Sequence, residues 1–152
     1  MTLLKCFTDS HIDNIAACLR LQPDAMILMG SLRSMEDALP RYRKLLKDRN
    51  MKTRIQVMDI SGKSYGDLCA ALLQLVRQQD KCVIDLTGGD ESLIMAVGAV
   101  LVGLEESVRR EVEVQTFRLD LGDVVDCVHD NCVLPHKPAN LTVEELVALH
   151  GD

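Results

Sequence analysis

Short apolar runs alternate with amphipathic helical patterns along most of this 152-residue chain. Strand-like runs at residues 2–8, 25–30, 52–60 and 81–86 are each followed by a helical pattern, at 9–21, 31–50, 64–79 and 90–109. The run "AMILMG" at 25–30 is apolar at every position, as in a strand buried on both faces. Parallel strands need helical crossovers, and these lengths suit them. The pattern therefore predicts an α/β fold, a Rossmann-like three-layer sandwich around a mostly parallel sheet.

The C-terminal quarter of the chain has a different pattern of apolar and polar residues. Residues 111–119 and 124–129 alternate between apolar and polar side chains and are separated by the turn "DLGD". This arrangement predicts an antiparallel hairpin at the edge of the sheet. A proline-containing linker, "PHKPAN", then leads to a helix over 141–151, in which Thr142 and Glu145 have capping-box spacing and Gly151 stands at the stop. We expect a domain over 1–136, and a linker and helix over 137–152 that lead toward an effector domain absent from this chain.

Three further serines have the spacing of helix caps. Ser10 with Asp13, Ser34 with Asp37, and Ser64 with Asp67 predict the starts of the helices after the first three strands. Pro40 would fall in the first turns of the second of these helices, where proline is tolerated best, and Asn50 would end it.

Composition and charge exclude several classes of protein. Hydrophobic residues make up 47% of the chain, which is enough for a core, and the net charge is −6, which argues against a general duplex-DNA binder. Two Phe, two Tyr and no Trp make an aromatic platform for bases improbable. There is no signal-peptide pattern and no apolar segment of the roughly 20 residues that span a bilayer, so we expect a cytoplasmic protein without a membrane partner.

The cysteines fit reduced core thiols better than a disulfide framework, because most lie inside apolar patterns. They stand at positions 6, 18, 69, 82, 127 and 132. Cys127, His129, Cys132 and His136 suggest zinc, but their spacing is irregular, so we expect no metal and no other cofactor.

Ligands of open α/β sheets bind beyond the carboxyl ends of the strands, where helix N-termini also favour anions. Four segments occupy those places here, at residues 8–11, 30–34, 61–65 and 87–92, and Arg33 and Lys63 are their cations. Neither the dinucleotide nor the P-loop glycine fingerprint is present. A tight turn with Thr87 or Asp90 as the helix cap explains the "TGGDE" loop as well as a ligand does, and a capping role is the commoner one for Ser31, Ser34 and Ser64. Asp9 and His11 suggest an acid and a base, although a cap beside a solvent-facing histidine is the commoner outcome.

The helical pattern over 93–104 carries no polar side chain. Such a helix has no face suited to water, so a second surface must cover the side that the sheet leaves open. We favour a homodimer in which the "TGGDE" loops of two subunits lie near the two-fold axis. The alternative is burial by the chain's own C-terminal hairpin and helix.

Four segments together resemble the CARF (CRISPR-associated Rossmann fold) domain, of the kind fused to a C-terminal PD-(D/E)XK-like nuclease. They are "TDSHIDNI", "MGSLRSMEDA", "DLTGGDESLIMAVGAV" and the closing "LTVEELVALHG". The resemblance implies a homodimeric sensor of a cyclic oligoadenylate in type III CRISPR defence, which controls an attached nuclease. The chain itself would be a sensor domain with no catalytic residue.

The resemblance also implies where the ligand lies, on the loops after the first and fourth strands with help from the second. It points to Thr8, Asp9, Ser10, Thr87, Gly88 and Gly89 as contacts, and to Asp90 and Glu91 as positions at the ligand without a phosphate role. Ser31, Arg33 and Lys63 on the other loops complete the expected site, in which Arg33 and Lys63 are the cations that could supply positive charge. In the family the glycine pair is usually followed by a hydroxyl residue and a lysine, whereas Asp90 and Glu91 stand here and would repel phosphates. Two alternatives stay open: a ring nuclease that cleaves its own cyclic ligand, and a ligand-free dimerisation module.

Overall fold

A single six-stranded sheet runs through the computed structural model, which describes residues 1–118, 122–128, 134 and 138–151. The strand order is β3-β2-β1-β4-β5-β6. All neighbours pair in parallel except β5 and β6, which are antiparallel. The predicted α/β fold, with its mostly parallel sheet and antiparallel edge, is confirmed. The strands are β1 (Thr2–Cys6), β2 (Ala25–Gly30), β3 (Arg54–Asp59), β4 (Cys82–Asp85), β5 (Val112–Arg118) and β6 (Asp123–Asp126).

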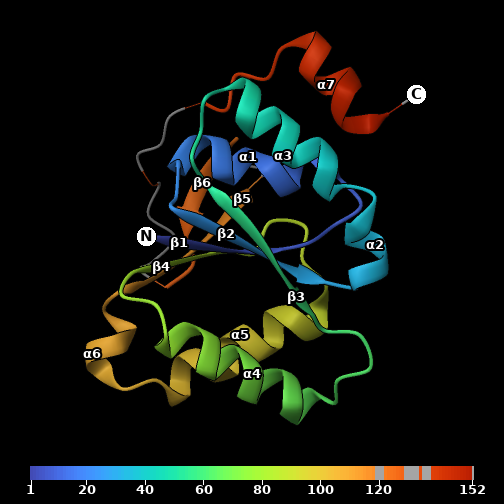
Figure 1. The fold of residues 1–152 in the computed structure, drawn as a ribbon. Helices are drawn as coiled ribbons and strands as arrows, with labels where there is room; N and C mark the ends of the chain where they lie inside the picture. The colour runs from blue at the N-terminus through green and yellow to red at the C-terminus, as the bar shows by residue number, and fades with distance from the viewer. Residues whose placement is uncertain (119–121, 129–133, 135–137, 152) are drawn as a thin grey trace.

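Helices cover both faces of this sheet (Figure 1). One layer holds α1 (His11–Leu21) and α3 (Leu39–Asp48), with α7 (Val143–His150) packed on their outer side, and the other holds α4 (Tyr65–Arg77) and α5 (Glu91–Gly103). Two short helices, α2 (Leu32–Glu36) and α6 (Glu106–Arg109), lie in connections. No described helix has the length and apolarity that crossing a membrane requires.

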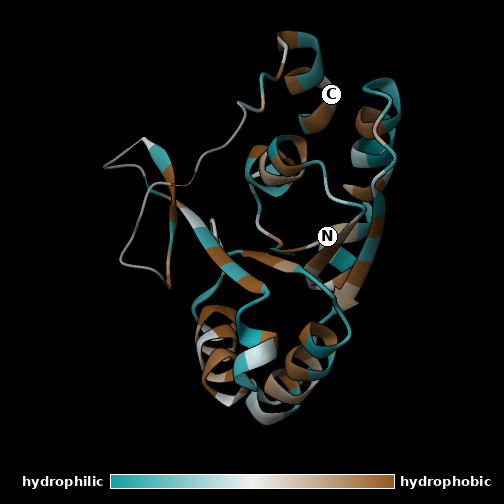
Figure 2. Cartoon of the chain, turned by 90° about the vertical axis from the view of Figure 1, so that its left-hand side faces the viewer, coloured by the Kyte–Doolittle hydropathy of each residue, from teal (hydrophilic) through white to brown (hydrophobic). Residues whose placement is uncertain are grey.

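Alternation along each strand divides the core into two clusters. Leu4 and Cys6 of β1 pack toward α4 and α5, whereas Leu3 packs toward α1 and α3. Hydrophobic residues accordingly gather between the sheet and the helices on either side of it (Figure 2). β2 is buried at all six positions, as its unbroken apolar sequence predicts.

Most predicted caps form. Ser10 Oγ accepts a hydrogen bond from the Asp13 N–H (3.3 Å), and Ser64 Oγ accepts one from the Asp67 N–H (3.1 Å). Thr142 and Glu145 complete a reciprocal capping box at the start of α7. Pro40 lies in the first turn of α3, and Asn50 adopts a left-handed φ of 56° just beyond its end.

Two predictions about helix boundaries are wrong. The predicted Ser34–Asp37 cap does not form, because Ser34 lies inside α2, and Ala38 precedes α3 without a side-chain cap. The single helix expected over 90–109 is divided into α5 and α6, because Leu104 adopts an extended backbone (φ −75°, ψ 143°) with its side chain buried in the core. Apolarity on every side does not by itself reveal where a helix stops.

The C-terminal helix α7 docks on α1 and α3. Arg49 reaches it with a bidentate pair to Glu145, in which both N···O distances are 2.6 Å, and donates further hydrogen bonds to the carbonyls of Ala139 and Asn140. This bonding with Arg49 lowers the pKa of Glu145 to about 2. Leu149 is buried in the same interface. Because α7 packs on α1 and α3, it does not cover α5 on the other side of the sheet. The C-terminal helix therefore does not bury the apolar helix α5, as one alternative had expected.

Candidate functional site

The strand order reverses direction between β1 and β4, which is the place where open α/β sheets hold ligands. The loops after these strands touch each other. A Cβ atom added to Gly88 would lie 2.8 Å from Thr8 Cγ2, and one added to Gly89 would lie 2.9 Å from Cys6 Cβ. Gly88 also has a φ of +69°, which L side chains rarely adopt. The glycine pair therefore serves the close approach of two loops at the switch point.

A buried ion pair supports the loop after β4 from below. Lys5 and Asp85 are neighbours in the β1–β4 register, and their side chains are 0% and 1% exposed, with Lys5 Nζ 3.4 Å from Asp85 Oδ1. Lys5 Nζ also donates to the Thr87 carbonyl (2.5 Å), while the carboxylate accepts from the Thr87 N–H (2.9 Å) and from Gln115 Nε2 (2.8 Å). The pair thus holds both the N–H and the carbonyl of Thr87.

The loop after β1 is ordered mainly by Asn14, a residue that the sequence analysis did not single out. Asn14 Oδ1 accepts from the Thr8 N–H (2.8 Å) and Asn14 Nδ2 donates to the Thr8 carbonyl (2.7 Å). Thr8 Oγ1 accepts from the Ser10 N–H (3.1 Å), and Ser10 Oγ caps α1, so both hydroxyls have structural partners. Asp9 is exposed.

Asp90 and Glu91 have a clear structural role. Asp90 is the N-cap of α5, and its Oδ1 accepts from the Leu93 N–H (3.0 Å). Glu91 is the first residue of the helix, where the dipole favours a negative charge. Thr87 Oγ1 accepts from the Phe117 N–H (2.9 Å), so of the two proposed caps it is Asp90 that acts.

The two predicted cations, Lys63 and Arg33, lie in different places on the surface. Lys63 lines a surface depression of about 530 Å³ together with Asp90, Glu91 and Ser92. Arg33 is exposed on α2, outside this depression, and Ser31 precedes that helix without a side-chain capping bond. Asp59 links the loops that carry them, because its Oδ1 accepts from the N–H groups of Leu32 (3.2 Å) and Ser61 (3.0 Å). These hydrogen bonds, chiefly those with Ser61, lower the pKa of Asp59.

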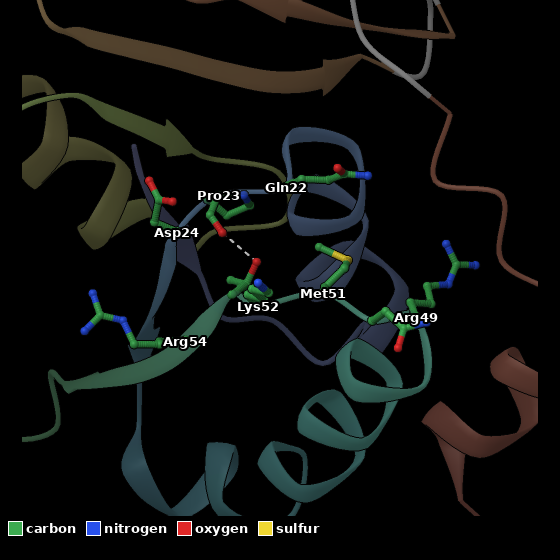
Figure 3. A pocket seen from close by; sticks show the side chains of 9 residues that line it. Gln22, Pro23, Asp24, Arg49, Met51, Lys52 and Arg54 are labelled. Atoms are coloured by element: carbon green, nitrogen blue, oxygen red, sulfur yellow. Dashed lines mark hydrogen bonds between the residues drawn. The ribbon is translucent and has the colours of Figure 1, made fainter.

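A second hollow lies at the opposite end of the sheet. It has a volume of about 450 Å³ and is formed by residues 22–24 and 49–54, with Thr53 Oγ1 donating to the Pro23 carbonyl (2.5 Å; Figure 3). It contains no residue of the predicted site. Its position at the amino ends of β2 and β3 is the reverse of where this fold class holds ligands.

Histidine and cysteine chemistry does not add to the site. The expectation of a solvent-facing His11 is wrong, because its Nδ1 lies 2.8 Å from Tyr42 Oη and its ring is half-buried. Burial raises the pKa of Cys6, Cys18 and Cys82 to about 12, as inert core thiols require, whereas Cys127 is exposed. His129, Cys132 and His136 of the weighed zinc pattern lie outside the described residues, and no cluster within the described part could hold a metal.

Sequence reasoning missed the residues that hold the loops in place: Lys5, Asn14, Asp59, Asp85 and Gln115. Lys5 and Asp85 carried a usable signal, since each is a charge among apolar residues inside a predicted strand, and opposite charges in adjacent strands favour pairing. Asn14 carried no comparable signal, because an asparagine in a helix is ordinarily solvent-exposed.

Removing one partner of the buried pair is expected to be far more damaging than removing one partner of a surface pair. Asp85→Asn leaves Lys5 buried opposite a neutral group, so the free energy of unfolding should fall by about 3–5 kcal/mol. Asp48→Asn, which breaks the exposed Lys44–Asp48 pair, should change it by less than about 1 kcal/mol. Urea denaturation measures both. Equal losses would contradict the structural role given to the buried pair.

Gly88→Ala tests the contact between the two loops, with Gly62→Ala as a matched control. Both glycines have a left-handed φ (+69° and +68°), but a Cβ atom at Gly62 meets nothing within 4 Å. The conformational penalty of about 1–2 kcal/mol is common to both variants. The additional loss of stability in Gly88→Ala then reports the clash with Thr8, and an identical loss in both would show that the loops do not touch.

Comparison with known proteins supports the fold. No protein-family model matches the sequence, and no curated protein does either. Among solved structures, the chain is similar to Can2 from Sulfobacillus thermosulfidooxidans in complex with cyclic tetra-adenylate (TM-score 0.72, 15% identity, 98% of this chain and 40% of that one). It is also similar to protein VC1899 from Vibrio cholerae (0.74, 9%, 99% and 39%).

A third similar structure is a type III CRISPR defence DNA nuclease activated by cyclic oligoadenylate (TM-score 0.68, 16% identity, 99% of this chain and 23% of that one). The chain thus spans about two fifths or less of the length of each of these proteins. Together they confirm the fold that the resemblance to CARF domains implies.

Proposed function

We propose that this chain is a cytoplasmic regulatory domain that binds a cyclic oligoadenylate on the loops after β1 and β4 and acts as a homodimer. The contact between these loops at the switch point carries the proposal. The N–H groups of Asp9 and Gly88 remain free of protein partners within the described residues. The N–H groups of Glu91 and Ser92 in the first turn of α5 also have no protein partner among the described residues, and such groups bind phosphate oxygens.

The likeness to the cyclic-oligoadenylate proteins supports the same ligand class. One of the similar structures holds cyclic tetra-adenylate, and another is a nuclease activated by cyclic oligoadenylate. This chain spans only part of the length of each of these proteins. We therefore propose, in addition, that it controls a nuclease attached after α7. Residues 1–136 would form the sensor, and residues 137–152 would form the connection to that nuclease.

The open face of α5 supports the homodimer. Met95 is 64% exposed and Val102 is 82% exposed, and Gly98 and Ala99 lie on the exposed side between them. This face is apolar and adjoins the loop after β4, so a second copy seated on it would bring two ligand loops together. A ring of identical nucleotides has the symmetry that such a groove offers.

Asp90 and Glu91 favour a second candidate, a dimerisation module without a ligand. Both residues line the depression beside the ligand loop, and among the described residues that line it Lys63 is the only cation. Two negative charges near phosphates lower affinity.

Calorimetric titration with cyclic tetra- and hexa-adenylate decides between these candidates. We expect binding that strengthens about 10- to 100-fold in the double variant Asp90→Thr/Glu91→Lys, because like-charge repulsion is replaced by attraction. Threonine keeps the capping ability of Asp90, so α5 should remain intact. Asp80→Lys, a charge change at the far end of the sheet, is the control and should have little effect. If neither ligand gives a heat of binding with the parent chain or with the double variant, the ligand-binding proposal is rejected and the dimerisation module is the remaining candidate.

Sedimentation tests the interface. Val102→Glu places a charge on the most exposed residue of this apolar face, near the end of α5, and should convert a dimer to a monomer at micromolar concentration. Val147→Glu is the matched control, since Val147 is also an exposed valine (56%) but lies on α7 in the opposite layer. A parent chain that sediments as a monomer would overturn the homodimer.

A further inference from the structure

A buried polar cluster lies between the ligand loops and the C-terminal helix, and the binding site makes no use of most of it. Asn14 and Tyr42 are 0% exposed, among the apolar residues that join α1, α3 and α7. Asn14 Nδ2 donates to Tyr42 Oη (3.0 Å), and Tyr42 Oη lies 2.8 Å from His11 Nδ1. Polar groups are costly in such a place unless every one of them is satisfied.

One end of the cluster is the loop after β1. The Asn14 amide binds both the N–H and the carbonyl of Thr8, as a neighbouring peptide group would. Asn14 is itself positioned by Tyr42, because the same Nδ2 group that reaches Thr8 also reaches the hydroxyl. A displacement of Thr8 by a ligand therefore disturbs the bond to Tyr42.

The other end is the last turn of α7. The His11 ring lies edge-on to the His150 ring, with centroids 5.7 Å apart and an angle of 83° between the planes. Arg41 Nη1 donates to the carbonyls of Leu149 and His150 (both 3.1 Å) and holds the end of the helix from α3. Thr8, Asn14, Tyr42, His11 and His150 thus form one unbroken series of contacts.

The protons in this series have one consistent arrangement. Burial raises the pKa of Tyr42 to about 12, so its hydroxyl keeps its proton. Asn14 donates to that oxygen, and His11 Nδ1 is the other partner of the hydroxyl among the described residues. The arrangement in which every group has a partner therefore has the hydroxyl donating to Nδ1 of a neutral His11 whose proton is on Nε2. Burial and the charges of Arg41 and His150 lower the pKa of His11, in agreement with this neutral form.

We propose that the Asn14–Tyr42–His11 cluster couples the loop after β1 to the docking of the last turn of α7. The clamped conformation of Thr8 and the docked conformation of α7 stabilise one another, and by linkage each responds equally to the other. The role of a ligand in moving Thr8 rests on the proposed function, whereas the coupling itself exists without a ligand. A binding event at the loop would in this way reach whatever follows α7 in the chain.

Hydrogen exchange on the ligand-free protein tests the coupling. Tyr42→Phe removes only the hydroxyl and should speed exchange of the amides at the end of α7 about tenfold, the order expected for one buried hydrogen bond. Tyr65→Phe removes an equivalent hydroxyl from an exposed position on α4 and should change nothing there. Unaltered exchange of α7 in Tyr42→Phe overturns the proposal.

The reverse direction uses a surface residue, so a folding defect does not obscure the result. His150→Ala should speed exchange of the Thr8 amide, which is bonded to Asn14, whereas Val147→Ala on the same helix should not. Faster exchange at every amide in Tyr42→Phe would indicate global destabilisation, and the His150→Ala result would then decide. An unchanged Thr8 amide in His150→Ala contradicts the coupling.

Cyclic tetra-adenylate is the probe for the ligand's part, with calorimetry run beside exchange. We expect binding to the parent chain to alter exchange at the end of α7 and Tyr42→Phe to bind without that alteration. Binding to the parent with no change at α7 would refute coupling to the ligand and leave the proposed function standing. Absence of binding would refute the proposed function, and the ligand-free variants would still decide the coupling.

Discussion

The buried Lys5–Asp85 pair is the interaction on which the rest of the site depends. Two charges inside a sheet are stable only when each is paired and hydrogen-bonded, and here Gln115 and the Thr87 backbone complete that requirement. The requirement fixes Thr87, and with it the glycine turn that follows. Because Gly88 and Gly89 then pack against Thr8 and Cys6, the loops after β1 and β4 form one unit in direct contact at the switch point.

The same pair limits how the site can attract an anion. Lys5 is neutralised by Asp85, so it offers no free charge to a phosphate, while Asp90 and Glu91 add negative charge at the start of α5. A second cation, Arg20, also lies 3.9 Å from Asp85, with its side chain 12% exposed. The groups at the surface that can attract an anion are backbone N–H groups, the α5 dipole and the outlying Lys63 and Arg33. Such groups are preorganised, and rigid donors lose little entropy on binding. The positive potential of the site is therefore low, and the shape of the site would select a ligand more than charge does.

The two helical layers have different roles around this unit. The α1–α3 layer is covered by α7 and contains the polar cluster that joins the Thr8 loop to the end of the chain. The α4–α5 layer leaves an apolar helix face open beside the second loop. Dimerisation through α5 and coupling to α7 would therefore use opposite faces of the sheet. A ligand bound between the two loops would contact elements that lead to each face.

The sequence by itself determined the α/β class, the succession of strands and helices along the chain, the antiparallel edge and most helix caps, because periodicity and capping are local properties. It also placed the glycine turn and Asp90 at the start of α5. Only the tertiary structure decided that Lys5 meets Asp85, that Asn14 binds Thr8 and that His11 meets His150, since each contact joins segments whose proximity depends on register and packing. The break at Leu104 accompanies burial of its side chain in the core, and the Ser34 cap fails because Ser34 lies inside α2.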